Sequence, residues 1–347
     1  MKPSDEGLRC FYKRLWLPFA APFVLSKLAM LGVADGDVCS LAQREIVLQF
    51  RDWPARNCVF HNAADLIEYL QDGIARNRSL PINIHFGPLW AAPHMALQPV
   101  WPPRAAKEDG STTGLDPGYA PNCDLLRPRE FERKERADTA RGELVLDVDM
   151  VCQRRMRIAG LCECGNAPQV CQRCWTAFML PAQRILTYVV RNFFGFRRCF
   201  TAFSGRRGFH LWIADPRVVQ WTFHERRAFV ARLLAVPHAD DALSDFVWTT
   251  VVGPCWEEHP DWARTRAEAW ALWYPELDAP VADKSHHMHK LPLMLNANTG
   301  YFCDILADPD DEQDRFVAAP EQLISLLTME PEMMLGCVAY LEHVLSE

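Results

Sequence analysis

The chain of 347 residues has a mass of 39.7 kDa, which predicts one or two domains. Hydrophobic residues make up 49% and charged residues 23%, a globular composition that excludes a disordered, collagen-like or simple coiled-coil chain. The net charge of −7 argues against a surface built for non-specific nucleic-acid binding, although a local basic groove needs only a few placed cations. No long uncharged apolar window occurs and two prolines interrupt the apolar stretch 15–24, so we expect neither a transmembrane helix nor a signal peptide.

Hydrophobic periodicity predicts helices and strands in alternation without a clean βαβ repeat. From the N-terminus to residue 150, we expect a helix at 8–33, a strand at 45–50, a helix at 63–75 with Asn62 as N-cap, and strands at 81–86 and 143–150. Beyond it, we expect a helix at 176–194, a hairpin of strands at 200–203 and 210–214, a helix at 218–235, partial helix over 237–275, a strand at 301–306 and mostly helix over 320–345. This mixture predicts an α/β chain of the mixed α+β type.

Residues 92–142 differ from the rest in composition. The segment is rich in proline and ends in the charge run REFERKERADTAR. We expect a flexible loop, either a solvated surface insertion or a segment that becomes ordered on binding.

The strand at 143–150 carries two carboxylates on one face. Because successive side chains point to opposite faces, Val145, Asp147 and Asp149 share a face. The opposite face is apolar and is expected to be core; it consists of Leu144, Leu146, Val148 and Met150. The Cα atoms of the two aspartates are about 7 Å apart, since a strand rises about 3.3 Å per residue. Such a pair can hold one or two Mg²⁺ or Mn²⁺ ions, the usual device of nucleotidyl transfer, or is a strand end running into a polar loop.

The cysteines favour free thiols and metal ligands over a disulfide framework, because there are thirteen, an odd number. Four of them crowd into one short segment: Cys162, Cys164, Cys171 and Cys174. The last pair forms C-x-x-C, a common half of a tetrahedral thiolate site, and the gap lets the first pair fold back onto it. We expect structural Zn²⁺; an iron–sulfur cluster, or buried thiols with one redox pair, are the alternatives.

Two further segments carry polar side chains suited to phosphate. In Ser-Gly-Arg-Arg-Gly-Phe-His at 204–210, two glycines bracket two arginines in a tight turn, and guanidinium groups grip phosphate oxygens. By itself this pattern is more typical of a solvated basic turn. In the loop 274–292, Asp278 can be a further metal ligand and Lys290 can reach a phosphate. The same loop holds histidines that bind metal, phosphate or nothing: His286, His287 and His289.

Taken in this order, the segments resemble one family, the small catalytic subunit of archaeal and eukaryotic DNA primases. The matching motifs are Asp147-Val148-Asp149, Cys162 to Trp175, Ser204 to His210, Leu277 to Val281, and Lys290. Weaker matches are Phe11 to Leu15, Arg44-Glu45 and Gly195-Phe196. The resemblance spans roughly 8–306; the combination is specific, whereas each motif alone is common.

The resemblance implies a primase-polymerase core that synthesises short RNA primers on single-stranded DNA during replication. It implies catalytic roles for Glu45 and for three aspartates that would hold two Mg²⁺ or Mn²⁺ ions: Asp147, Asp149 and Asp278. The nucleotide-binding residues would be Ser204, Gly205, Arg206, Arg207, Gly208, His210, His287, Lys290 and Asn296. The four clustered cysteines would hold structural Zn²⁺. Implied partners are a primase large subunit, a single-stranded DNA template, ribonucleoside triphosphates and, in a eukaryote, the DNA polymerase α complex in the nucleus.

The same resemblance suggests a division of the chain. Its parts would be 1–91, the N-terminal part of the catalytic core; 92–142, the insertion; 143–236, core with a zinc knob at 152–175; 237–275, a reduced helical subdomain; and 276–347, the C-terminal part of the core and terminal helices. The family pattern S-P-F-x-x-H after Lys290 departs here to Leu-Pro-Leu-Met-Leu-Asn, which places Asn296 where the family has a nucleotide-contacting histidine. We therefore expect a divergent member.

Two other functions fit parts of the sequence. A primase-polymerase that extends primers with deoxynucleotides for damage tolerance would share the same core, although the cysteine cluster and the arginine motif favour the replicative primase. A non-catalytic zinc scaffold that binds single-stranded DNA or assembles the large subunit would fit the change at Asn296. Retention of all three aspartates argues against that scaffold.

Overall fold

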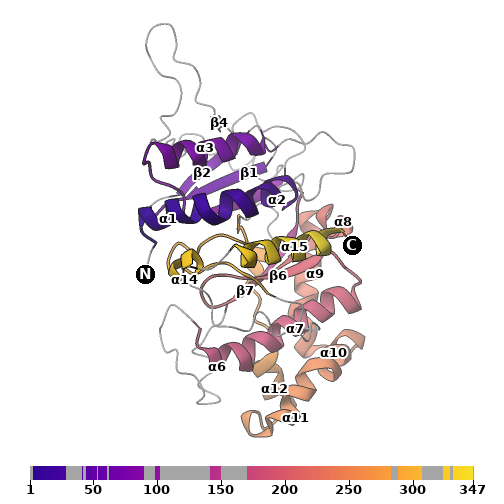
Figure 1. The fold of residues 1–347 in the computed structure, drawn as a ribbon. Coiled ribbons are helices and arrows are strands. Elements are labelled where there is room, and N and C mark those ends of the chain that lie inside the picture. The colour runs from indigo at the N-terminus through magenta and orange to yellow at the C-terminus, as the bar shows by residue number, and fades with distance from the viewer. Residues whose placement is uncertain are drawn as a thin grey trace.

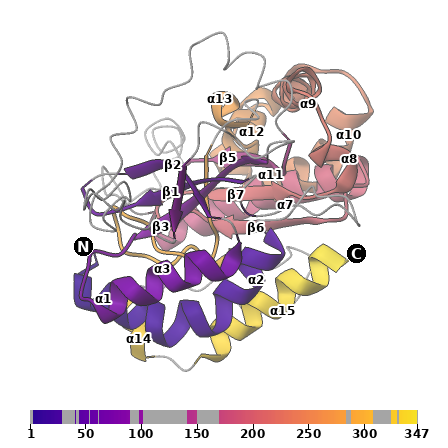
Figure 2. The same cartoon turned by 90° about the horizontal axis from the view of Figure 1, so that it is seen from above.

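The computed structural model describes residues 3–28, 41, 44–52, 54–60, 62–89, 98–101, 141–149, 170–282, 288–306, 323–328 and 331–346. Within these ranges the chain has the predicted mixed α/β architecture, with a five-stranded sheet A and a four-stranded sheet B flanked by helices (Figures 1 and 2). None of the described helices is long and apolar enough to cross a membrane.

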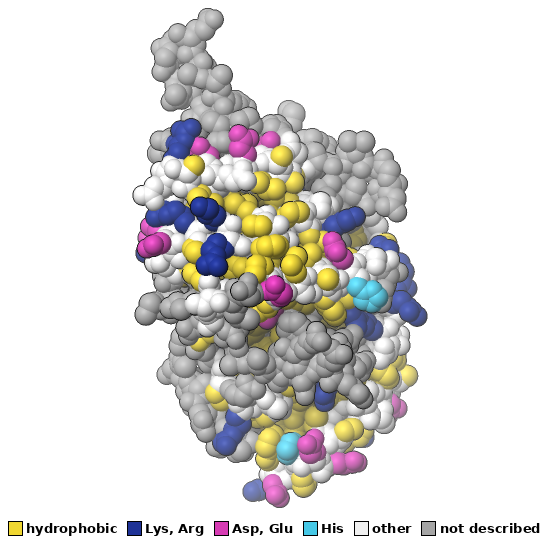
Figure 3. Space-filling model, viewed as in Figure 1, with side chains coloured by type: hydrophobic (Ala, Val, Ile, Leu, Met, Phe, Trp, Pro, Cys, Tyr) yellow, Lys and Arg dark blue, Asp and Glu magenta, His cyan; other side chains and the backbone are white. Residues whose placement is uncertain are grey.

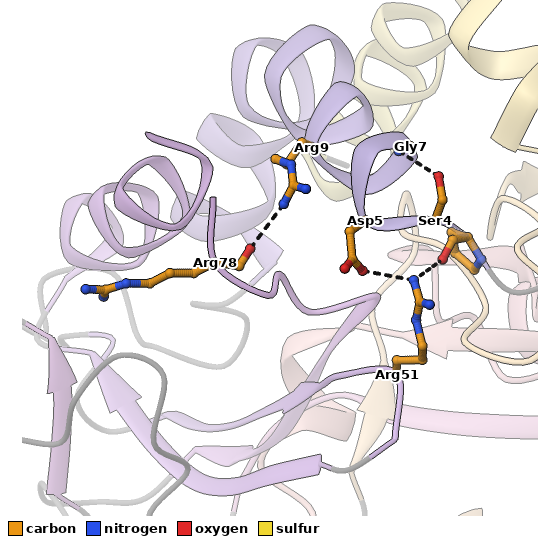
Figure 4. A network of polar contacts seen from close by, with 7 residues as sticks. Ser4, Asp5, Gly7, Arg9, Arg51 and Arg78 are labelled. Atoms are coloured by element: carbon orange, nitrogen blue, oxygen red, sulfur yellow. Dashed lines mark hydrogen bonds and ion pairs between the residues drawn. The ribbon is translucent and has the colours of Figure 1, made fainter. Parts of the chain in front are cut away.

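The N-terminal helix covers sheet A. It runs from α1 (Asp5–Phe11) through the π-helical segment η1 (Tyr12–Ala20) into α2 (Ala21–Ser26), and the Ser4 hydroxyl caps it by accepting from the Gly7 N–H at 3.0 Å. Arg51, in the turn after the first strand, ties the start of the helix to the sheet (Figure 4). Its guanidinium donates to the Pro3 carbonyl at 2.8 Å and to Asp5 at 2.9 Å, while Arg9 reaches the Arg78 carbonyl at 3.5 Å.

Sheet A is mostly antiparallel, with strand order β4-β2-β1-β3-β8 and a parallel β2–β4 pair. Its strands are β1 (Arg44–Gln49), β2 (Pro54–Phe60), β3 (Asn83–Leu89), β4 (Gln98–Trp101) and β8 (His289–Lys290). Helix α3 (Ala63–Ala75) starts at Asn62 as predicted, because the Asn62 side chain accepts from the Asp65 N–H at 3.0 Å.

Two strands of sheet A correct the sequence prediction. β4 lies inside 92–142, where only loop was expected, and gains its strand geometry by pairing with β2. β2 itself was not predicted, because its buried residues do not alternate: Ala55, Cys58 and Phe60 are buried, and a register shift against β1 absorbs the irregular spacing.

Sheet B is antiparallel in the order β5-β7-β6-β9 and confirms the predicted strand and hairpin. Its strands are β5 (Leu144–Val148), β6 (Cys199–Phe203), β7 (Phe209–Ile213) and β9 (Ile305–Leu306). One face, with Leu144, Leu146 and Val148, packs into a core built with the following helices, as expected. The other face faces sheet A, and Val145 is buried there at 1% exposure, so only the end of β5 is open.

One long helix packs on the outer face of sheet B. It is continuous through α6 (Gln172–Cys174), η5 (Trp175–Met179), α7 (Leu180–Tyr188) and η6 (Val189–Phe193). The helix expected at 218–235 is instead two, α8 (Pro216–Val219) and α9 (Phe223–Ala235), because Thr222 and Glu225 form a capping box that restarts it.

The remaining helices follow the predicted helical segments, except α13, which lies in the segment 274–292 that was expected to be a loop. After α9 come η7 (Val236–His238), α10 (Ala242–Val247), η8 (Trp248–Val252), α11 (Gly253–Glu258), η9 (Pro260–Trp262), α12 (Arg266–Trp273), α13 (Ala279–Ala282), α14 (Leu323–Thr328) and α15 (Glu332–Ser346). The segment 237–275 is therefore more helical than expected. α14 and α15 pack beside the N-terminal helix, on the face that shows an apolar surface in Figure 3.

A buried ion pair joins the two sheets. Arg44 at the start of β1 donates to Glu143 just before β5, and both side chains are almost fully buried. Arg226 of α9 donates to the carbonyls of Gly142 and Glu143 at 2.5 and 3.0 Å. The entry into β5 is therefore fixed against both sheet A and the helices.

Candidate active site

The open end of β5 collects three aspartates from two distant segments. β7 pairs with β5 on one side, and Leu277 forms a bridge to Val148 on the other. The Asp278 N–H donates to the Asp147 carbonyl at 3.0 Å. The backbone thus brings Asp278 next to the Asp147 and Asp149 pair.

The three carboxylates raise the local negative charge. The pKa of Asp147 is raised to about 7, first by burial and then by the charges of Asp149 and Asp278, while Lys290 on β8 opposes the shift. His210 lies opposite Asp147 in the β5–β7 register, with Nε2 3.6 Å from Oδ1. Asp147 therefore interacts electrostatically with acidic and basic groups from both sheets.

The aspartates do not form a ready-made ligand cluster. Across the described ranges, no group of three or more His, Cys, Asp or Glu side chains is placed to hold one metal ion. The chemistry of the donor set nevertheless fits a divalent cation. Carboxylate oxygens are the ligands that Mg²⁺ and Mn²⁺ prefer, and the charge that raises the pKa of Asp147 is one that a cation offsets.

The turn between β6 and β7, residues 204–208, is called the arginine turn below. Gly205 has φ +75°, and a Cβ there would lie 2.6 Å from the Cβ of Asn296. A Cβ on Gly208 would lie 1.9 Å from the Val148 carbonyl oxygen. Both glycines are therefore required by close approach to the protein's own backbone and side chains.

One arginine of this turn borders the aspartates, and both arginines have unused donors. Arg207 lies 3.7 Å from Asp149, with its side chain 24% exposed. The Nε atoms of Arg206 and Arg207 are buried without a hydrogen-bond partner in the described part of the chain. Donors left unused beside a carboxylate site are suited to an anion, since guanidinium groups bind phosphate oxygens in pairs.

Asn296 has a role different from the expected one. Its side chain is 1% exposed, its Nδ2 donates to the Ser204 carbonyl at 2.9 Å, and its Oδ1 accepts from the N–H groups of Asn298 and Thr299. The amide is thus engaged with protein groups, while a contact between Asn296 and a nucleotide stays a prediction.

Sheet A contributes two further predicted residues. Lys290 lies on β8, beside β3, and its charge reaches Asp147. Glu45 lies on β1 next to Gly87 of β3, where an added Cβ would be 3.2 Å from the Cβ of Glu45. His289 packs its ring edge-on against Trp212 at 5.9 Å, which assigns it to the junction of the sheets.

Half of the predicted zinc site is described. The Cys174 N–H donates to the Cys171 thiol at 3.4 Å, and the ring of Trp175 packs against Phe203 at 5.4 Å. The C-x-x-C pair thus adjoins the end of β6, directly before the arginine turn. Cys162, Cys164, His286 and His287 lie outside the described residues.

Sequence reasoning missed two residues that shape this site, Glu143 and Thr299, and marked Arg44 only as part of a weak motif match. Arg44 and Glu143 form the buried pair between the sheets, and Thr299 donates to the Gly205 carbonyl at 2.5 Å. The stretch Asn-Ala-Asn-Thr-Gly carries a turn signal that could have drawn attention to Thr299. No local pattern marks Glu143.

Comparison with known proteins follows the same motifs. The sequence model of the family "DNA primase small subunit" matches residues 146–308. Curated DNA primase small subunits match at 35% identity over 29% of this chain in Saccharomyces cerevisiae, 41% over 21% in Drosophila melanogaster and 31% over 35% in Schizosaccharomyces pombe. These segments span 23%, 15% and 25% of the respective relatives.

A solved structure resembles the fold only weakly. The "Polymerase Domain from Mycobacterium tuberculosis Ligase D in complex with DNA" aligns over 88% of this chain and 77% of its own, with 12% identity and a TM-score of 0.34, and we draw nothing further from it. The fold and site define a mixed α/β protein whose sheet B and following loops lie mostly within the segment that the family model matches. Residues 146–308 of this chain are similar to the DNA primase small subunit, and the matched segments span a quarter or less of the curated relatives named above.

Proposed function

We propose that this chain is a DNA primase catalytic subunit that synthesises short RNA primers on a single-stranded DNA template by two-metal nucleotidyl transfer. One observation carries the proposal: three carboxylates at the end of β5 border an arginine turn whose Nε donors are unused. A nucleoside triphosphate with its cations matches this arrangement, because its phosphates fit the arginines and its cations fit the carboxylates.

The acidic and the basic residues of the site have separate roles in this proposal. Asp147, Asp149 and Asp278 hold Mg²⁺ or Mn²⁺, which when bound activate the attacking 3′ hydroxyl and neutralise the triphosphate. Arg206, Arg207 and Lys290 bind the phosphates and the departing pyrophosphate.

The neighbours of these residues have supporting roles. The Ser204 hydroxyl accepts from the Gly208 N–H at 3.2 Å and keeps its own proton for a phosphate oxygen. His210, whose Nε2 lies 3.6 Å from Asp147 Oδ1, adds a hydrogen-bond donor beside the carboxylates. Glu45 remains a proposed active-site residue on sheet A.

The cysteine cluster is proposed to hold structural Zn²⁺ through Cys162, Cys164, Cys171 and Cys174. The N–H···S contact at Cys171 fits a thiolate ligand, since a sulfur that carries negative charge is the better acceptor. Zinc bound by these cysteines would stabilise the segment that packs against the end of β6 through Trp175 and Phe203. Cys174→Ser should release the metal and lower stability, which elemental analysis and thermal unfolding would measure.

The partners are proposed from the same relationship. They are a primase large subunit, single-stranded DNA, ribonucleoside triphosphates and, if the source is eukaryotic, the DNA polymerase α complex in the nucleus. With a net charge of −7, the isolated chain is expected to bind single-stranded DNA weakly. The large subunit would therefore contribute much of the affinity for the template.

The test is primer synthesis on unprimed single-stranded DNA, with labelled ribonucleotides and Mg²⁺ or Mn²⁺. Short RNA from the native protein but not from Asp149→Asn is the expected result. Extension of supplied primers with deoxynucleotides alone would favour the damage-tolerance polymerase. No product, even with a large subunit added, would favour the non-catalytic scaffold.

A further inference from the structure

A second loop packs directly against the arginine turn. Residues 296–300, called the asparagine loop here, join two short antiparallel stretches that bridge Leu295 to Phe302. The loop is closed by hydrogen bonds from the Asn296 N–H to the Tyr301 carbonyl at 2.9 Å and from the Gly300 N–H to the Asn296 carbonyl at 2.8 Å. Gly300, with φ +73°, supplies the left-handed turn.

Two side chains of the asparagine loop hold two successive carbonyls of the arginine turn. Asn296 Nδ2 donates to the Ser204 carbonyl at 2.9 Å, and Thr299 Oγ1 donates to the Gly205 carbonyl at 2.5 Å. The Cβ of Asn296 also fills the space beside Gly205. Both donors are buried, at 1% and 4% exposure, so water does not compete with these bonds.

The asparagine loop is itself fixed. Asn296 Oδ1 accepts from the N–H groups of Asn298 and Thr299 at 2.9 and 3.3 Å, and Thr299 Oγ1 accepts from the Tyr301 N–H at 3.2 Å. Asn83 of β3 donates to the Leu295 carbonyl at 2.7 Å, which anchors the loop to sheet A. The arginine turn therefore rests on a loop whose conformation is fixed by the protein's own hydrogen bonds.

We propose that Asn296 and Thr299 are positioning residues that hold the arginine turn in its phosphate-binding conformation before the nucleotide arrives. The ligand named here rests on the proposed function, whereas the clamp itself rests on the hydrogen bonds. A turn with two glycines is costly to order, because each residue that becomes fixed on binding loses backbone freedom. A turn ordered in advance spares the ligand that cost.

The chemistry of the two side chains explains the choice of residues. Asn296 donates and accepts at once, a combination that a carboxylate cannot reproduce. Thr299 does the same through one hydroxyl. The position that the family fills with a histidine thus serves a structural contact here, and the phosphate contacts fall to Arg206, Arg207 and Lys290.

The test compares Thr299→Val, which removes the hydroxyl at nearly constant volume, with Thr299→Ser, which keeps it. Asn296→Asp replaces the donor by an acceptor oxygen and adds a buried ionisable group, and Asn298→Ala is a matched control because that side chain is exposed. We expect Thr299→Val and Asn296→Asp to speed amide exchange at residues 205–208, and GTP with Mg²⁺ to restore the protection. The KM for GTP should rise roughly tenfold in each, with a smaller change in kcat.

Thr299→Ser and Asn298→Ala should leave exchange in the arginine turn and the KM for GTP near the native values. Unchanged exchange at 205–208 in both folded test variants would overturn the clamp, whatever the activity. If the native protein binds no nucleotide while the test variants still speed this exchange, the clamp stands and the proposed function fails. Should Asn296→Asp not fold, Thr299→Val decides the question alone.

Discussion

The two halves of the candidate site differ in how they are held. In the arginine turn, the carbonyls of Ser204, Gly205 and Gly208 all accept hydrogen bonds, and the turn is packed against β5 and the asparagine loop. The aspartates also have a fixed backbone, through the β5–β7 pairing and the Asp278 N–H. The Asp147 carboxylate, however, is unfavourably placed, because burial first and then the charges of Asp149 and Asp278 raise its pKa to about 7.

The two halves are therefore expected to contribute differently to stability. Neutral hydrogen bonds order the arginine turn, and the Nε donors of its two arginines are left unused. In the acidic half, ionisation of Asp147 lowers the free energy of unfolding. Strongly shifted pKa values of this kind gather at functional sites. Changes to the backbone of the first half should therefore destabilise the protein, while removal of charge from the second half should stabilise it.

Gly208→Ala should give the largest effect. The new Cβ would lie 1.9 Å from the Val148 carbonyl oxygen, and backbone atoms on a paired strand cannot move aside cheaply. We expect unfolding to become easier by on the order of 4 kcal/mol, measured by chemical denaturation, with loss of primer synthesis. Gly336→Ala in α15 is the control: nothing lies within 4 Å of its added Cβ, so about 0.5 kcal/mol of stabilisation is expected. Equal stability of the two variants would contradict the packing described here.

Glu143→Gln should have the next largest effect, because it leaves the buried Arg44 without a counter-charge. Breaking such a pair costs about 3 kcal/mol, and thermal unfolding measures it. The double variant Arg44→Met with Glu143→Met should recover much of the loss, since neither charge then remains buried. A loss below about 1 kcal/mol for Glu143→Gln would show that this pair does not hold the sheets together.

Asp147→Asn should stabilise the metal-free protein while abolishing primer synthesis. The pKa of Asp147 is raised from 3.8 to about 7, so ionisation costs stability progressively between these values and fully above pH 7. Replacing the carboxyl should therefore add on the order of 2 kcal/mol at pH 8 and nothing below about pH 4. Thermal unfolding in chelator at both values checks the sign, with the exposed Asp149→Asn as a smaller-effect control. A gain that is equal at both pH values would show that ionisation of Asp147, disfavoured by burial and by its acidic neighbours, does not cost stability.

Ser204→Ala should have the smallest effect of the series. It removes the hydroxyl that accepts from the Gly208 N–H at 3.2 Å, while the backbone bond from the Ser204 N–H to the Gly208 carbonyl remains. We expect a loss of about 1 kcal/mol in unfolding free energy. The KM for GTP should rise modestly, and steady-state kinetics would detect it. A full loss of activity would mean that Ser204 contributes more than a turn contact and one phosphate contact.

Local sequence signals predicted the parts of the fold that depend on neighbouring residues. α3 starts at Asn62 and sheet B has its strands where alternation placed them, because caps and periodicity act over a few residues. β2 and β4 were missed, since a bulge and a parallel partner define them. In the site, the aspartates and the arginine turn were predicted from their motifs. The new role of Asn296 was not, because its partner Ser204 is 92 residues away in the sequence.

The most direct test of the two-metal site is Mn²⁺ binding measured by electron paramagnetic resonance, with and without GTP. We predict that the native chain binds two Mn²⁺ ions in the presence of GTP. We also predict that Asp149→Asn stays folded but loses bound Mn²⁺. Native protein that binds no Mn²⁺, or Asp149→Asn that binds as much as the native protein, would contradict the assignment of the β5 aspartates as the metal site.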